Sequence, residues 1–397
     1  MRTLIKYYDK DALKNIMATL TLKPHKVVFF YDKGIQDITF FYGIRKCFRK
    51  YIPQVILETY PVDILNMDEI YTKTIKAIGD GKDCMMDLTG GSELMMIAGY
   101  KAGNEKKIDL LYTDLVNGVI MNLEDGSIVK KTTVLTLDDF VDARGARFIG
   151  NSHSEPGPER YENILEMSRT LFANLEKWKQ TSGYFQTVTA RFAPHELHIN
   201  SRIEVSQKSG KKVTPNRKLL YAFQRYGFIR NLKISKDHLS FIFSSWEDKQ
   251  YIISYGVWLE LYVFISAKMT GAFDDVKLGA MIDWNAYDGV TVAGNEIDVI
   301  ISDNSLPVFI SCKLRSADTA ALNELLIAKK RVGGWFSKGI IVTFGRDKQD
   351  NTGTYKRAKE LGIELLDSKD ILRHDFGEVL VKTIREHDLV SLKWKKV

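Results

Sequence analysis

The chain has 397 residues, too many for one ordinary hydrophobic core, so two or three domains are expected. Hydrophobic residues make up 45% and charged residues 27%, and the net charge is +7, which is typical of a globular protein that could bind a polyanion. No apolar run approaches the roughly 20 residues of a membrane-spanning helix, and the start has no signal-peptide pattern. Cys47, Cys84 and Cys312 form no Cys-x-x-Cys pair. Together these features predict a reduced, cytoplasmic protein without a membrane partner.

The first part of the chain alternates apolar strand-like runs with segments of helical periodicity. The predicted strands are Lys26–Tyr31, Gln54–Tyr60, Cys84–Leu88 and Ile108–Tyr112, and the predicted helices are Ile35–Tyr51, Asp68–Ile78 and Ser92–Lys101. Such alternation favours a parallel, doubly wound, Rossmann-like sheet, whose ligands bind at the carboxyl ends of the strands.

One turn at such a strand end stands out, because Thr89, Gly90, Gly91 and Ser92 lie between a strand and a helix. Two glycines let a ligand approach the backbone, and the helix N-terminus that follows favours an anion. The alternative is that the glycines make a tight turn and Ser92 caps the helix. No Gly-x-Gly-x-x-Gly follows the first predicted strand, and the chain has no P-loop motif, which disfavours a dinucleotide cofactor or a P-loop NTPase.

The middle of the chain is basic. Gly150–Pro158 reads as a linker, so we place a domain boundary at residue 150, and the helical stretch Tyr161–Trp178 follows. Ten basic residues then face a single acid, Glu204: they are Arg202, Lys208, Lys211, Lys212, Arg217, Lys218, Arg225, Arg230, Lys233 and Lys236. With the strand Leu239–Phe243, this pattern predicts a small winged-helix-like unit. It could follow a phosphate backbone or be a solvated basic surface.

The last part of the chain has a mixed order of helices and strands. The elements are a helix Gln250–Ala267, strands Lys277–Trp284, Asn295–Ser302 and Val308–Lys313, a helix Ala317–Arg331, a strand Gly339–Phe344 and a helix around Tyr355–Leu361. The second and third of these strands are separated by a short turn, which predicts a hairpin.

Residues with chemical potential gather on this hairpin. Strand alternation places Glu296 with Asp298, and Ser311 with Lys313 on the facing strand, while the preceding helix carries Glu260. Carboxylates can hold a hard divalent cation, and a nearby lysine can orient water and stabilise charge on a phosphate. The set therefore suits metal-dependent cleavage of a phosphodiester. The alternative is a partly buried Asp298–Lys313 ion pair without a catalytic role.

The order of helix glutamate, strand aspartate and x-x-lysine resembles the PD-(D/E)xK nuclease superfamily, over roughly residues 246–370. The resemblance implies that Asp298 and Glu260, or Glu296, hold Mg²⁺ or Mn²⁺, and that Lys313 positions the attacking water. The family has an acid two residues before the lysine, where this chain has Ser311. At this departure from the family we expect Ser311 to hydrogen-bond a metal-bound water instead of binding the metal itself.

The N-terminal turn resembles that of CARF domains, the sensors of type III CRISPR systems. This resemblance implies a homodimer that binds a cyclic oligoadenylate through Thr89, Gly90, Gly91 and Ser92, with further contacts from the other strand ends at Asp32, Lys33, Gly34 and Asp114.

Together the parts resemble the CRISPR-associated CARF–nuclease proteins. The resemblance implies residues 1–150 as the CARF domain, 151–245 as the winged-helix-like connector and 246–397 as a restriction-endonuclease-like α/β domain. Cyclic tetra-adenylate would activate cleavage of single-stranded DNA or RNA, or nicking of duplex DNA. Two rivals stay open. One is a ligand-controlled nucleic-acid-binding regulator with a degenerate nuclease domain, and the other is a nuclease that needs no activator.

Overall fold

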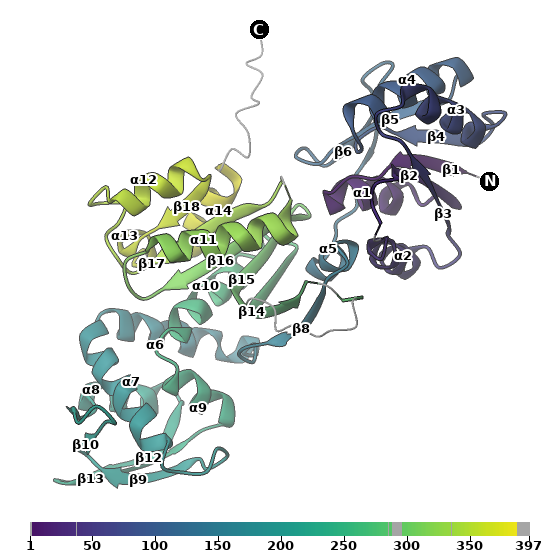
Figure 1. Cartoon of the computed structure of the whole chain (residues 1–397). Helices are drawn as coiled ribbons and strands as arrows, with labels where there is room; N and C mark the ends of the chain where they lie inside the picture. Colours follow the sequence, from purple (N-terminus) through teal and green to yellow (C-terminus); the bar gives the residue numbers. More distant parts are fainter. Residues whose placement is uncertain (1, 37, 285, 288–295, 335, 387–397) are drawn as a thin grey trace.

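The computed structural model describes residues 2–36, 38–284, 286–287, 296–334 and 336–386. They form an N-terminal domain, a connector and a C-terminal domain (Figure 1). Asn295, the first residue of a predicted strand, and residues 387–397, the end of the third predicted domain, lie outside the described residues.

The N-terminal domain is a doubly wound sheet, as predicted. Its strand order is β3-β2-β1-β4-β5-β6-β7, and the first five of these strands are parallel. Helices α1 and α2 cover one face, and α3 and α4 cover the other. The bounds are β1 Thr3–Tyr7, α1 Ala12–Leu22, β2 Lys26–Asp32, α2 Phe40–Tyr51, β3 Ile56–Val62, α3 Met67–Ile78, β4 Cys84–Asp87, α4 Glu93–Lys106, β5 Asp109–Asp114, β6 Val119–Asn122 and β7 Ile128–Lys131.

The sequence prediction missed β1, the central strand. Lys6 interrupts its short apolar run and so weakens the strand pattern. In the structure the Lys6 side chain is 1% exposed, and its ammonium pairs with the buried carboxylate of Asp87 on β4. This ion pair allows a charged residue to lie at the centre of the sheet.

The connector contains helices packed on a small antiparallel sheet of order β12-β13-β9. The predicted helix Tyr161–Trp178 is two helices, because the chain leaves helical geometry at Asn174. The elements are α6 Tyr161–Phe172, α7 Leu175–Thr189, β9 His198–Arg202, β10 Val205–Ser206, β11 Lys212–Val213, α8 Arg217–Arg225, β12 Ile229–Ile234, β13 His238–Phe243 and α9 Trp246–Ile253. Buried side chains of the connector and of the C-terminal domain form one continuous core, with Trp258 of the latter against Phe223 and Phe228.

The C-terminal domain is built on a sheet of order β18-β17-β16-β15-β14-β8. Helix α10 packs against one face and α11 against the other (Figure 1). The bounds are α10 Val257–Thr270, β14 Asp275–Asp283, β15 Glu296–Asp303, β16 Leu306–Lys313, α11 Thr319–Ala328, a π-helical turn Lys329–Gly333, β17 Lys338–Thr343, α12 Gly353–Glu360, β18 Ile363–Leu366, α13 Ser368–Ile371 and α14 Phe376–Glu386. The predicted hairpin is β15–β16, and the single predicted helix over 250–267 is instead α9 and α10.

The strand β8, Arg147–Asn151, belongs to this C-terminal sheet although it precedes the connector. The boundary predicted at residue 150 therefore falls inside β8. Helix α5, Leu137–Ala143, comes just before it and touches both domains. Asp139 of α5 accepts hydrogen bonds from Lys50 and Tyr51 of α2, and Asp138 pairs with Lys277 of β14.

Among the described residues, no single helix combines the length and apolar character needed to cross a bilayer, although α9 and α10, bent by 117°, meet that test as a pair.

Candidate active site

The β15–β16 hairpin brings the predicted aspartate and lysine together. Lys313 Nζ lies 3.6 Å from Asp298 Oδ2, and the Ser311 hydroxyl donates to the same oxygen at 3.3 Å. The Cys312 N–H donates to it as well, at 2.6 Å. The Asp298 carboxylate thus accepts a hydrogen bond from the backbone of β16, just beyond the last paired residues of the hairpin. This hydrogen bond holds the carboxylate beside Lys313.

Helix α10 supplies the third predicted acid. Glu260 Oε2 is buried and has no hydrogen-bond partner among the described residues. Burial, followed by the neighbouring carboxylates of Asp298 and Glu296, raises the pKa of Glu260 to about 8. Burial also raises the pKa of Asp298, against the opposing charge of Lys313. Both shifts arise first from burial, which the opposing charge of Lys313 does not offset.

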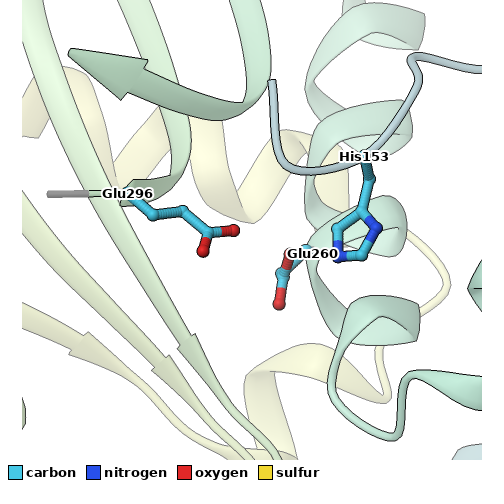
Figure 2. Close-up of side chains that lie close together, drawn as sticks. All are labelled: His153, Glu260 and Glu296. Carbon is cyan, nitrogen blue, oxygen red and sulfur yellow. The ribbon is translucent and has the colours of Figure 1, made fainter. Parts of the chain in front are cut away.

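A histidine that the sequence analysis did not single out completes this group. Ligand atoms of His153, Glu260 and Glu296 lie within 4.8 Å of one another. Figure 2 shows the His153 ring beside the Glu260 carboxylate, with Glu296 reaching toward both from its strand. Burial lowers the pKa of His153, which favours the neutral imidazole. The only sequence signal for a metal ligand at this position was that the residue is a histidine, because His153 lies in the segment predicted as a linker.

These side chains fit a divalent cation. Donor atoms that share one ion at about 2.1 Å lie within about 4.2 Å of each other, so small side-chain rotations would suffice. A cation would pair with the Glu260 carboxylate, whose Oε2 has no hydrogen-bond partner among the described residues, and would offset the repulsion among the three carboxylates. The residues present therefore match the Mg²⁺ or Mn²⁺ that the sequence predicts.

The hairpin also borders an open cavity of about 250 Å³. Its lining includes Glu296, Asp298, Ser311 and Lys313 on the hairpin and Glu324 on α11. The predicted acid and lysine thus face a space that a substrate group could enter.

The predicted residues of the N-terminal domain lie at one edge of its sheet. Strands β1, β2, β4 and β5 are parallel, so the turns after them share that edge. The turns contain Asp32, Lys33 and Gly34 after β2, Thr89, Gly90, Gly91 and Ser92 after β4, and Asp114 at the end of β5. The structure therefore brings all the predicted contacts to the same side of the domain.

Several of these residues form hydrogen bonds or ion pairs within the domain itself. The buried Thr89 hydroxyl donates to Asp87 and accepts from the Thr113 N–H at 2.7 Å, so Thr89 fixes the shape of the turn. The Ser92 hydroxyl caps α4 by accepting from the Met95 N–H at 3.3 Å. Asp114 accepts from two backbone N–H groups of the turn that follows it. Lys33 is exposed, and its ammonium forms an ion pair with Asp63 at 2.9 Å.

The turn after β1 adds residues that the prediction could not contain, because β1 was missed. Asp9 Oδ2 accepts from the Gly91 N–H at 3.3 Å and pairs with Lys14 at 3.1 Å. The β1 and β4 turns therefore touch at the centre of the edge, and a lysine lies next to them.

Gly91 is required by packing as well as by its backbone conformation, with φ +96° and with an added Cβ only 2.5 Å from Tyr7 Cβ. We expect Gly91→Ala to destabilise the domain by about 2–4 kcal/mol, since strain and overlap add. Gly126 is the matched control, because its φ is +71° but nothing lies within 4 Å of an added Cβ. Thermal unfolding followed by circular dichroism should show a clearly larger loss for Gly91→Ala than for Gly126→Ala. Equal losses would mean that the contact with Tyr7 is unimportant.

Comparisons with known proteins agree on the architecture. Residues 247–379 match the family model of the Card1-like endonuclease domain. Protein VC1899 from Vibrio cholerae has a similar structure, with a TM-score of 0.75 and 16% identity over 97% of this chain and 98% of that one. Can2 from Sulfobacillus thermosulfidooxidans, solved in complex with cyclic tetra-adenylate, has a TM-score of 0.69 and 17% identity over 96% and 97%.

A type III CRISPR defence DNA nuclease activated by cyclic oligoadenylate gives a TM-score of 0.52 and 15% identity over 86% of this chain and 45% of that one. A search of the curated proteins finds no match to this chain. At these identities the structures show a shared fold, which extends over nearly the whole chain in the first two cases.

Proposed function

We propose that this chain, which carries a Card1-like endonuclease domain at residues 247–379, is a metal-dependent nuclease of type III CRISPR defence activated by a cyclic oligoadenylate. The observation that carries the proposal is a group of three acids, the half-buried Glu260 and Asp298, whose pKa values burial raises, and the exposed Glu296. Asp298 lies beside Lys313, and the hairpin residues of the group line an open cavity. A group of this kind is typical of catalysis rather than of stability.

Each residue then has a role. Glu260, Glu296 and Asp298 would hold Mg²⁺ or Mn²⁺, which when bound would neutralise developing charge on the phosphate and lower the pKa of the attacking water. Lys313 orients that water and stabilises the negative charge of the transition state. Ser311 and the Cys312 N–H hold Asp298 in place through the hydrogen bonds described above.

The substrate is a nucleic acid, DNA or RNA. All ten basic residues counted in the connector are exposed, and the acid among them, Glu204, is paired with Lys212 at 2.8 Å. Such a surface favours contact with a phosphate backbone, so the connector would hold a strand near the C-terminal domain.

The activator would bind at the carboxyl edge of the N-terminal sheet, most simply as cyclic tetra-adenylate, the ligand with which the similarly folded Can2 was solved. A ring with two-fold symmetry suits an isologous dimer. Two apolar side chains on α4 support such a homodimer, because Ile97 and Tyr100 are 53% and 47% exposed and lie three residues apart on one helix face.

The deciding experiment is cleavage of labelled single-stranded DNA, single-stranded RNA and supercoiled plasmid with Mn²⁺, with and without cyclic tetra-adenylate. We expect cleavage only with the activator. Cutting without it would indicate a nuclease that needs no activator. Binding of the activator without any cutting would favour the regulator with a degenerate nuclease domain, the rival that Ser311 supports.

A lysine at the strand ends tests the activator site. Lys33→Ala should raise the cyclic tetra-adenylate concentration for half-maximal cleavage by about tenfold, since it removes a charge-assisted phosphate contact. Cleavage at saturating activator should not change. Lys82→Ala is the matched control, because Lys82 is exposed and precedes β4, at the opposite edge of the sheet. The same activation curve for both variants would rule out a contact from Lys33.

A further inference from the structure

We infer that His153 is a ligand of the catalytic cation, and that its imidazole makes the site prefer Mn²⁺ over Mg²⁺. The inference rests on the proposed function, because it adds a ligand to the same site. It also assigns a role to a residue outside the C-terminal segment that matches the endonuclease family.

The hairpin by itself cannot complete a ligand set. Position 311 carries a serine, and its hydroxyl is directed to Asp298 Oδ2. That same oxygen also receives the Cys312 N–H and lies 3.6 Å from Lys313 Nζ. One of the two Asp298 oxygens is therefore committed to its own hairpin, and another donor is needed nearby.

His153 stands where that donor is needed. It joins Glu260 and Glu296 in a group whose ligand atoms are within 4.8 Å of one another (Figure 2). Glu260, whose Oε2 is buried without a hydrogen-bond partner among the described residues, is one of the three residues of this group. The three side chains come from the loop after β8, from α10 and from β15, so they surround one point from different elements.

The loop that carries His153 is fixed on both sides. The Ser152 N–H donates to the Gly279 carbonyl at 2.8 Å, and the Tyr251 hydroxyl donates to the Ser154 carbonyl at 2.5 Å. The Leu278 N–H donates to Glu155 at 3.2 Å. The backbone on both sides of His153 is thus held in place next to the acids before any ion binds, and a pre-organised ligand raises affinity.

The ligand chemistry predicts the choice of metal. Mg²⁺ prefers oxygen donors and gives up its waters reluctantly, whereas imidazole suits transition metals. A site with one imidazole and several carboxylates should therefore bind Mn²⁺ more tightly than Mg²⁺, and the difference should shrink when the imidazole is removed.

Pulsed EPR of Mn²⁺ bound to the full chain tests this directly, because a coordinated imidazole gives a nitrogen modulation. We expect the modulation in the native protein and its loss in His153→Gln, together with at least about tenfold weaker Mn²⁺ binding by isothermal titration. The preference for Mn²⁺ over Mg²⁺ should fall in the same variant. His198→Gln is the matched control, because His198 is exposed on β9 of the connector.

Bound Mn²⁺ without a nitrogen modulation in the native protein would overturn the inference, and so would a modulation that persists in His153→Gln or a failure to bind Mn²⁺. The native-protein spectrum requires no variant to fold. Failure of the proposed function would look different, with the modulation present but no cleavage of any nucleic acid. Activator-dependent cleavage without the modulation would keep the nuclease and remove only the role of His153.

Discussion

Lys313→Met is expected to lower the rate of metal-dependent cleavage by at least about 10²-fold, because it removes the ammonium group that orients water and stabilises the transition state. Methionine keeps an apolar stem of similar length, and the Lys313 side chain is only 26% exposed, so the packing of the hairpin should persist. Single-turnover cleavage at saturating activator measures the loss, and thermal unfolding checks that the fold is intact.

The same exchange at Lys382 provides the control. Lys382 is exposed on α14 of the same domain, and its one ion pair among the described residues is a long one, 3.9 Å, with Glu386. Lys382→Met should cleave as the native chain does. Unchanged cleavage by Lys313→Met would separate the activity from this hairpin and would support the regulator with a degenerate domain.

Glu260→Gln is expected to abolish cleavage. In the metal-free protein it is also expected to raise stability relative to the native chain, and to do so more at pH 8 than at pH 5. The pKa of Glu260 is about 8 in the folded chain, against an ordinary value of 4.5. Between these values the folded protein keeps a proton that the unfolded chain releases, so the free energy of unfolding falls as pH rises. Glutamine cannot ionise and removes this loss, which is on the order of 2–4 kcal/mol.

The measurement is the melting temperature of both proteins at pH 5 and pH 8, without metal and with Mn²⁺. The melting temperature of the variant, relative to that of the native chain, should rise as pH rises. Mn²⁺ should raise the melting temperature of the native chain alone. Glu378→Gln, at an exposed position of α14, should follow the native chain. A constant difference at both pH values would show that Glu260 is not protonated in the fold.

The hairpin could be predicted from sequence because its signal is local. Period-two alternation and a short turn place Asp298 next to the Ser311–Lys313 segment, and the structure has these residues in contact. Glu260 could be added because it lies on the helix before the strands. The roles of these residues stay predictions until the variants are measured.

The residues that were missed depend on contacts between distant segments. Lys6 interrupts the apolar pattern of β1, so the pattern alone does not predict a strand. The charge of Lys6 is buried there because it pairs with Asp87, 81 residues away. His153 is similar, since its partners Glu260 and Glu296 come from other elements far along the chain. Local propensity carries no information about such pairs.

β8 has a consequence for how this architecture can be divided. Residues 147–151 pair with the outer edge of β14, and a polypeptide that began at residue 246 would leave that edge of β14 without a partner strand, although β15 still pairs with the other edge. An open strand edge pairs readily with other chains, so such a fragment would be prone to aggregation. Any recombination that exchanges the N-terminal domain while preserving this sheet must therefore join the chain before Arg147 and leave Arg147–Glu155 with the C-terminal domain.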